Sequence, residues 1–327
     1  MAAIQPLPEA RCNNMQNDAY GTSVENTHSI PLELGRATVQ SANRPDGTEE
    51  CVADNVVAGG AGNGPGQRFE GRVALVTGAS RGIGLAIAHR IVAEGGRVVI
   101  TGRRAETLQE AVAELGPDRA LGIAGKADDA EHRADAIGQA IERFGRLDHL
   151  VNNAGINPAY GPLAELDTTV ARKILEVNVI AALEWTREAV AAAAGAEAAD
   201  DSAAAAAGGS LRSIVNMASV AGTASGPNIA FYGVSKAALI NLTIQLADEL
   251  APTTRVNALA PAVVKTRLAR ALYEGREEEA AAAYPLRRLG VPDDVAGPAA
   301  FLLSDDAAWV TGQTLLVDGG ASVRTAL

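Results

Sequence analysis

A serine between two glycines offers the first candidate chemistry in this chain of 327 residues. The segment GASRG at 78–82 matches the G-x-S-x-G pattern that exposes a nucleophilic serine in hydrolases. Together with Gly84, its glycines could instead form a turn that binds phosphate through backbone N–H groups at the start of a helix. The two hypotheses assign Ser80 either to attack on a substrate or to contact with a cofactor.

The rest of the chain favours the phosphate-binding turn. A hydrolase of this pattern needs a histidine base after its nucleophile and acid, but no histidine follows His149, and His89 is expected on the surface of the next helix. No Gly-Lys-Ser/Thr follows, so the segment is not a Walker A loop, and its G-x-x-x-G-x-G spacing differs from G-x-G-x-x-G. We therefore expect Ser80 to contact a cofactor phosphate.

Apolar strands alternate with helical segments on either side of this turn. Strands are expected at 72–78, 97–102, 147–155, 213–217, 255–261 and 314–320, and helices at 85–94, 105–115, 130–144, 168–193 and 231–250. Such alternation predicts an α/β fold. We expect a Rossmann-type doubly wound parallel sheet with helices on both faces, in a single domain over residues 68–327.

Two segments depart from the alternation. Residues 1–67 are polar and rich in Gly, Pro and Asn, which predicts a mostly disordered N-terminal extension. Residues 191–210 form an alanine-rich, low-complexity insertion between a helix and a strand, which we interpret as a tolerated surface insertion.

Composition excludes several classes of protein. The net charge of −11 argues against nucleic acid as a partner, since that binding depends on Lys and Arg. The only cysteines are Cys12 and Cys51 and the four histidines are scattered, so neither a disulfide framework nor a metal site is predicted. Neither a membrane-spanning run nor a secretory signal is evident, and we expect a cytoplasmic protein.

Further motifs follow the glycine turn in a fixed order. They are TGASRGIG at 77–84, NNAG at 152–155, Asn178 in LEVNVIAAL, Ser219 in IVNMASVAG, Tyr232 and Lys236 in YGVSK, and the late strands RVNALAP and TGQTLLVDGG. On these motifs residues 68–320 resemble the short-chain dehydrogenase/reductase family. Ser219 precedes Tyr232 by 13 residues, the family's usual interval. One departure is Pro261-Ala262, where the family usually has Pro-Gly.

The resemblance implies an oxidoreductase that transfers a hydride between a nicotinamide cofactor and a carbonyl or alcohol substrate. Tyr232 is then the general acid/base, and the charge of Lys236 lowers the pKa of its phenol from about 10. Ser219 donates to the substrate oxygen, and Asn178 organises a water that relays protons to Lys236. The alternative, a dinucleotide-sensing protein without turnover, is disfavoured because such proteins typically lose the tyrosine or the lysine, and both are present here.

The second strand indicates which nicotinamide cofactor is bound. An NAD enzyme has Asp or Glu at its end, whereas here Gly102 is followed by Arg103 and Arg104, which suit a 2′-phosphate. We therefore expect NADP(H) rather than NAD(H). The expected cofactor contacts are Gly78, Ser80, Arg81, Gly82, Ile83, Gly84, Arg103, Asn153, Ala154, Gly155, Tyr232, Lys236, Pro261, Val264 and Thr266. Either Lys126 or Asp128 could lie beside the adenine.

The substrate is less closely specified than the cofactor. Its wall is expected from residues 156–160, 220–231 and 265–273, where Leu268, Leu272 and Tyr273 favour an apolar alcohol or ketone. The pattern is similar to 3-oxoacyl-[acyl-carrier-protein] reductases and to general carbonyl or alcohol dehydrogenases. The resemblance also implies a homotetramer or homodimer in which long helices pair across two-fold axes.

Overall fold

The computed structural model describes residues 66–198, 211–226 and 228–323. They contain one parallel sheet of seven strands in the order β3-β2-β1-β4-β5-β6-β7. The strands are β1 (Val73–Val76), β2 (Arg97–Gly102), β3 (Ala120–Ala124), β4 (His149–Asn152), β5 (Ser213–Met217), β6 (Arg255–Pro261) and β7 (Thr314–Val317). The predicted doubly wound α/β fold is confirmed.

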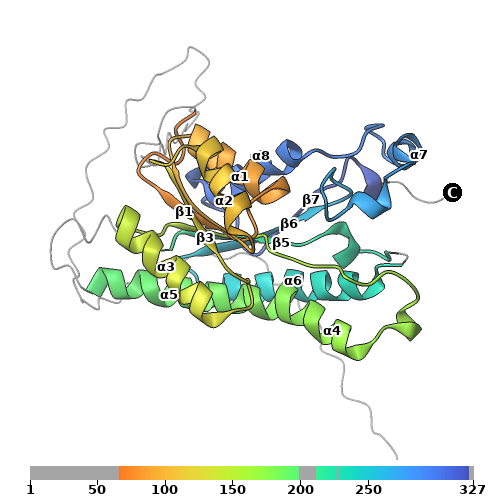
Figure 1. Ribbon diagram of the computed structural model, residues 1–327, viewed down its shortest axis with the longest axis horizontal. Helices are drawn as coiled ribbons and strands as arrows, with labels where there is room; N and C mark the ends of the chain where they lie inside the picture. Colours follow the sequence, from red (N-terminus) through yellow and green to blue (C-terminus); the bar gives the residue numbers. More distant parts are fainter. Residues whose placement is uncertain (1–65, 199–210, 227, 324–327) are drawn as a thin grey trace, which may run out of the picture. The chain divides into compact units, whose positions relative to one another are not determined.

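Helices cover both faces of the sheet (Figure 1). One face carries α1 (Gly82–Ala93), α2 (Ala105–Leu115) and α8 (Pro292–Leu303), and the other α3 (Ala130–Phe144), α5 (Ala181–Ala198) and α6 (Ala230–Glu249). Alternate residues of β1 serve the two cores: Ala74 and Val76 pack with α1 and α8, and Leu75 packs with α3 and α5. Strands of a parallel sheet are apolar on both faces for this reason.

The predicted helix at 168–193 is not a single regular helix. It consists of α4 (Thr168–Leu175), a π-helical turn at Glu176–Ile180 and α5. A π turn holds more residues than an α turn, and so it rotates the chain that follows it. Asn178 lies in the middle of this turn and is only 1% exposed. The sequence predicted a helix around Asn178 but not the irregular turn that buries it.

The two atypical segments lie largely outside the described residues. Only Gly66 and Gln67 of the predicted extension are described, and α5 continues through Ala198 into the predicted insertion. Among the helices in the described ranges, none is long and apolar enough to cross a membrane. The described residues also contain no cluster of three or more His, Cys, Asp or Glu side chains that could hold a metal ion.

The carboxyl ends of the strands gather the sequence motifs at one edge of the sheet. Gly78 follows β1, Gly102 ends β2, Asn152 ends β4, Ser219 follows β5 and Pro261 ends β6. The strand order reverses between β1 and β4, because β1 is followed outward by β2 and β3 on one side and by β4 on the other. Ligands of open α/β sheets bind at such a switch point.

Candidate active site

The turn between β1 and α1 needs its glycines for steric reasons. Gly78 and Gly82 have φ angles of 63° and 62°, in the left-handed region that favours glycine. A Cβ on Gly84 would lie 2.5 Å from Nδ2 of Asn153 and 2.8 Å from Cα of Ala79. These backbones therefore approach more closely than any side chain allows.

The NNAG segment supports the glycine turn. The Asn153 side-chain amide donates hydrogen bonds to the carbonyls of Thr77 (2.8 Å) and Gly78 (3.1 Å). The Thr77 hydroxyl accepts hydrogen bonds from the backbone N–H groups of Asn153 and Ala154, at 3.0 Å each. Two motifs separated by some seventy residues thus form one rigid unit, in which Asn153 holds the turn in position.

This turn lines a cleft of about 1250 Å³ that can hold a dinucleotide. The predicted contacts that line it are Gly78, Ser80, Arg81, Gly82, Ile83, Gly84, Arg103, Asn153, Ala154, Gly155 and Thr266. Pro261 and Val264 do not line it: Val264 packs in the core, and the Pro261 carbonyl accepts a hydrogen bond from Ser219. The Tyr232 and Lys236 side chains lie outside the cleft lining too, so these four remain predictions as cofactor contacts.

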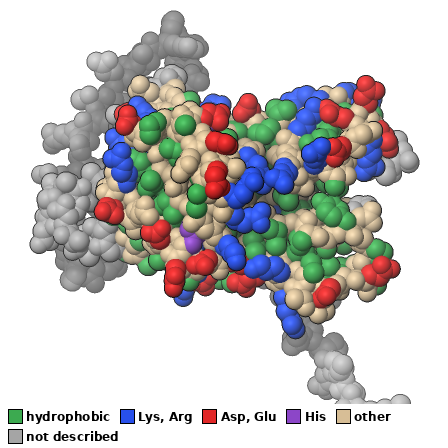
Figure 2. All heavy atoms as spheres, in the orientation of Figure 1, with side chains coloured by type: hydrophobic (Ala, Val, Ile, Leu, Met, Phe, Trp, Pro, Cys, Tyr) green, Lys and Arg blue, Asp and Glu red, His purple; other side chains and the backbone are tan. Residues whose placement is uncertain are grey.

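Positive side chains from several segments line the cleft. Two of them, Lys173 and Lys265, form ion pairs with Asp128 and Glu277. The others form no ion pair with a described carboxylate, and they are Arg81, Arg103, Arg104, Lys126 and Arg267. Burial lowers the pKa of Arg81, and the positive charges of Arg267, Arg104 and Arg103 lower it further. Figure 2 shows Lys and Arg side chains gathered around a hollow in this face. A phosphate-bearing cofactor fits this cation cluster together with the glycine turn.

Lys126 and Asp128, the two candidates for the adenine position, both line the cleft. Asp128 forms an ion pair with Lys173, which lowers the pKa of its carboxyl group. Its carboxylate is therefore already partnered, whereas Lys126 forms no ion pair with a described carboxylate. The sequence indicates Arg104 near the 2′-phosphate and Lys126 as a candidate beside the adenine, although neither is among the expected cofactor contacts. Arg267 has no such sequence signal, because its place beside them depends on the tertiary structure.

The predicted catalytic residues converge beside this cleft. Ser219 follows β5, while Tyr232 and Lys236 lie one turn apart on α6. The Lys236 ammonium is 5.6 Å from the centroid of the Tyr232 ring and donates a 2.7 Å hydrogen bond to the carbonyl of Met217. Lys236 is 2% exposed, and this burial lowers its pKa to about 8.

The pKa of the Tyr232 phenol differs from what the sequence led us to expect. Burial raises the pKa of its phenol to about 12, and a hydrogen bond with Ser219 offsets only part of that rise. The expectation of a lowered pKa is therefore wrong for the chain by itself. The Tyr232 side chain is half-buried, and the Lys236 ammonium lies beside its ring and is held by the carbonyl of Met217. A phenol of this kind is protonated at neutral pH and is suited to donate a proton.

Asn178 is held by partners on two segments, Ile156 and Ser235. Its Oδ1 accepts a 2.8 Å hydrogen bond from the N–H of Ile156, and its Nδ2 donates to the Ile156 carbonyl and to the Ser235 hydroxyl, at 3.0 Å each. Both N–H donors of the amide are thus used by the protein. A Cβ placed on Gly155 would lie 3.4 Å from both Asn178 Oδ1 and Lys236 Nζ, so these two atoms flank the same small space. The predicted water relay stays a prediction.

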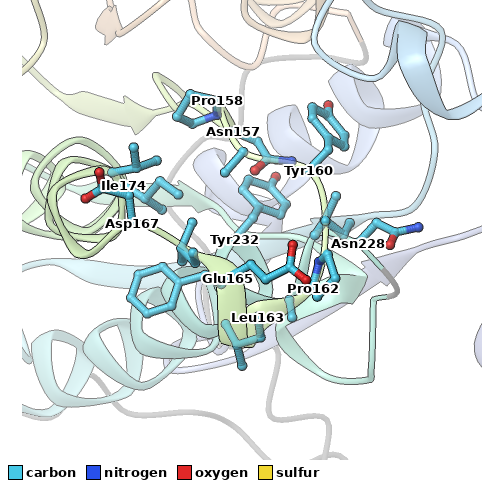
Figure 3. A pocket seen from close by; sticks show the side chains of 17 residues that line it. Asn157, Pro158, Tyr160, Pro162, Leu163, Glu165, Asp167, Ile174, Asn228 and Tyr232 are labelled. Atoms are coloured by element: carbon cyan, nitrogen blue, oxygen red, sulfur yellow. The ribbon is translucent and has the colours of Figure 1, made fainter.

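A second cavity, of about 300 Å³, opens next to Tyr232 (Figure 3). Residues 157–163, 165–167 and 228–232 line it, together with Val170 and Ile174. The predicted wall segments 156–160 and 220–231 therefore contribute in part. In the third segment Leu268 lines the larger cleft, while Leu272 and Tyr273 line neither space. Sequence reasoning missed residues 161–167, which carry no recognisable motif.

Comparison with known proteins connects this geometry to an enzyme family. A family model described as Enoyl-(Acyl carrier protein) reductase matches residues 78–322. The chain is 39% identical over 267 residues to Dehydrogenase/reductase SDR family member 4 of Caenorhabditis elegans, covering 79% of this chain and 98% of that protein. It is 38% identical to Tropinone reductase-like 3 of Erythroxylum coca, covering 79% and 96%. A Brucella melitensis crystal structure titled as a short-chain dehydrogenase/reductase, glucose/ribitol dehydrogenase, superimposes with a TM-score of 0.69 at 34% identity, covering 78% and 98%.

Proposed function

Because the chain belongs to the short-chain dehydrogenase/reductase family, whose members are nicotinamide-dependent oxidoreductases, we propose that it interconverts a ketone and an alcohol with NADP(H). The observation that carries this proposal is the convergence of Ser219, Tyr232 and Lys236 between a dinucleotide-sized cleft and a smaller cavity. Catalysis requires the reacting groups to meet in this way.

Tyr232 is the proton donor to the carbonyl oxygen in the reductive direction. Its high pKa keeps the phenol protonated, and Ser219 donates a second hydrogen bond to the same oxygen as negative charge develops there. Bound in the larger cleft, the cofactor supplies the hydride. Lys236 keeps two of its three N–H donors after bonding Met217, and these are available for the cofactor ribose and for proton return to Tyr232.

NADP(H) is favoured over NAD(H) by the positive charges at the end of β2. Gly102 occupies the position where a carboxylate would bind the ribose of NAD and repel a 2′-phosphate. A Cβ on Gly102 would lie 3.2 Å from the Ser80 hydroxyl, so Ser80 borders the same space as Arg103. A hydroxyl and at least one guanidinium are suitable ligands for that phosphate.

A homo-oligomer is supported by exposed apolar side chains on two separate surfaces. Ile180, Val234 and Ile244 are exposed near the π turn and along α6. Phe301, Trp309, Leu315 and Leu316 are exposed on and around α8 and β7, and Trp309 is 100% exposed. Two such surfaces on one chain suit a tetramer built from two kinds of two-fold contact.

The experiment that tests the proposed function is NADPH oxidation against a panel of ketones, with Tyr232→Phe measured alongside the unsubstituted protein. Losing the proton donor should reduce kcat by about 10²- to 10⁴-fold. The dissociation constant for NADPH should stay within about twofold, because the phenol is not required for binding the phosphates. Ketone reduction that survives in Tyr232→Phe contradicts the assignment of Tyr232, and an unsubstituted protein that binds NADPH without turnover favours the sensor instead.

A further inference from the structure

The cavity beside Tyr232 has apolar side chains in its walls, and its volume of about 300 Å³ suits a small carbon skeleton. Val170 and Ile174 of α4 contribute from one side, and Ile229 and Phe231 from the segment that leads into Tyr232. Figure 3 shows Asn157, Tyr160 and Glu165 around the Tyr232 ring. A ring or short chain can therefore pack on the walls while its carbonyl reaches the Tyr232 hydroxyl.

The charge of this cavity is negative. Its described lining contains Glu165 and Asp167 but no Lys, Arg or His. Asp167 is partly committed elsewhere, since its carboxylate caps α4 by accepting a 2.7 Å hydrogen bond from the N–H of Thr169. Glu165, at the end of the short 3-10 helix Leu163–Glu165, forms no ion pair or hydrogen bond with a described side chain. Its carboxylate is free to act on a ligand.

Asn157, which lines both this cavity and the larger cleft, carries a hydrogen-bond acceptor without a described donor. Oδ1 of Asn157 is buried, and no described residue donates a hydrogen bond to it. A buried acceptor without a partner costs free energy, which a ligand that brings an O–H or N–H donor recovers. Asn157 lies next to Ile156, which is fixed on both backbone polar atoms by Asn178, so the acceptor is mounted on a rigid segment.

We propose that the substrate is a small ketone, or the matching alcohol, whose substituent carries an O–H or N–H donor and no negative charge, with a cationic amine as the best match. This inference rests on the proposed function, because it assigns the cavity to the substrate of that reaction. Glu165 attracts the positive charge and Asn157 accepts from the donor. A carboxylate in the same position meets Glu165 as a like charge and offers Asn157 nothing.

The test uses one ring ketone with four different substituents. Cyclohexanones bearing a methyl, hydroxyl, dimethylamino or carboxylate group opposite the carbonyl share a skeleton and differ in charge and donor. With saturating cofactor, kcat/KM should be at least about tenfold higher for the dimethylamino than for the carboxylate compound. It should be about fivefold higher for the hydroxyl than for the methyl compound.

Two variants separate the two parts of the inference. Glu165→Gln should remove the preference for the cation over the anion and leave the preference for hydroxyl over methyl intact. Asn157→Leu should remove the preference for hydroxyl over methyl, and the dimethylamino compound should still be preferred over the carboxylate compound through the charge of Glu165. Glu110→Gln is the matched control, because it removes the same charge from an exposed position on α2 that lines neither space. Equal effects of Glu165→Gln and Glu110→Gln overturn the role of Glu165.

Calorimetric titration of the four ketones into protein saturated with NADP⁺ gives a readout that does not require turnover. The inference is overturned if the carboxylate compound binds as tightly as the dimethylamino compound, or if none of the four binds. If the dimethylamino compound binds best, Glu165→Gln abolishes that order and no ketone is reduced, then the inference holds and the proposed reaction fails.

Discussion

The two spaces near Tyr232, the proposed proton donor, differ in charge and in construction. The larger one is bordered by the glycine turn and by Arg81, Arg103, Arg104, Lys126 and Arg267. The smaller one is bordered by side chains of residues 157–167 and 228–232, with carboxylates but no cation in its described lining. Lys236 lies buried between the reacting tyrosine and the backbone of β5.

The two spaces also differ in what determines the residue types that line them. In the glycine turn of the larger space, a Cβ on Gly78 or Gly84 would lie less than 3.0 Å from a neighbouring backbone atom, so sterics dictate these two residue types. The smaller space is lined mostly by residues of the loops 157–167 and 228–229, together with residues of α4 and α6. The loop side chains can change without disturbing the core. The proposed cofactor site therefore depends in part on backbone sterics, whereas the proposed substrate site depends on side chains.

The strongest test of the rigid unit formed by the glycine turn and the NNAG segment is Gly84→Ala. The added methyl group must displace Asn153 or the backbone of Ala79. We expect kcat/KM to fall by about a hundredfold, since a small misplacement at the site is sufficient for that loss. The free energy of unfolding should fall by about 1–3 kcal/mol. Gly138→Ala, on the exposed face of α3 with open space around it, is the control and should be neutral or slightly stabilising.

The positive charge of the larger space is tested by Arg103→Ala. Losing a charge-assisted hydrogen bond to the 2′-phosphate should raise KM for NADPH by about 10- to 100-fold. KM for NADH should change little, because that cofactor lacks the phosphate. Initial rates with both cofactors measure the ratio, and Arg187→Ala on α5, outside the cleft lining, is the control. Equal losses for NADPH and NADH would show that Arg103 does not discriminate between them.

The buried Lys236 predicts that the rate of ketone reduction depends on pH. Lys236 has a pKa of about 8, so its ammonium loses its proton as the pH rises through that value. We expect kcat/KM for ketone reduction to fall about tenfold per pH unit above pH 8. Tyr232, with a pKa of about 12, stays protonated over this range.

The pH dependence of the free energy of unfolding distinguishes a fall in rate caused by Lys236 from one caused by loss of the fold. The ordinary lysine pKa of 10.5 exceeds that of Lys236, so the unfolded chain binds this proton more tightly than the folded chain does. The buried Lys236 charge therefore destabilises the fold below pH 8, and this destabilisation is relieved as the pH rises from 8 to 10.5. Circular dichroism at each pH checks that the fold persists, and a flat rate profile up to pH 10 would rule out Lys236 as the titrating group.

The alternation of strands and helices was sufficient to predict the parallel sheet and most of its elements. Where the prediction was wrong, the cause was local geometry that periodicity does not record. The π turn at Glu176–Ile180 has helical composition, yet it interrupts the predicted helix at 168–193 and buries Asn178. Packing against Ile156 and Ser235 through the Asn178 side chain stabilises that turn, and these contacts are distant in sequence.

Sequence alone determined the glycine turn, the strand ends that carry the motifs, and the pairing of Tyr232 with Lys236. Each depends on short-range sterics or on helical spacing, which residue types and intervals record directly. Tertiary structure alone decided that Arg267 joins the other cations of the cleft, that the pKa of Tyr232 is raised, and that Glu165 borders an acidic cavity. Charge clustering and desolvation depend on which distant segments meet in space, and for that reason no local pattern encodes them.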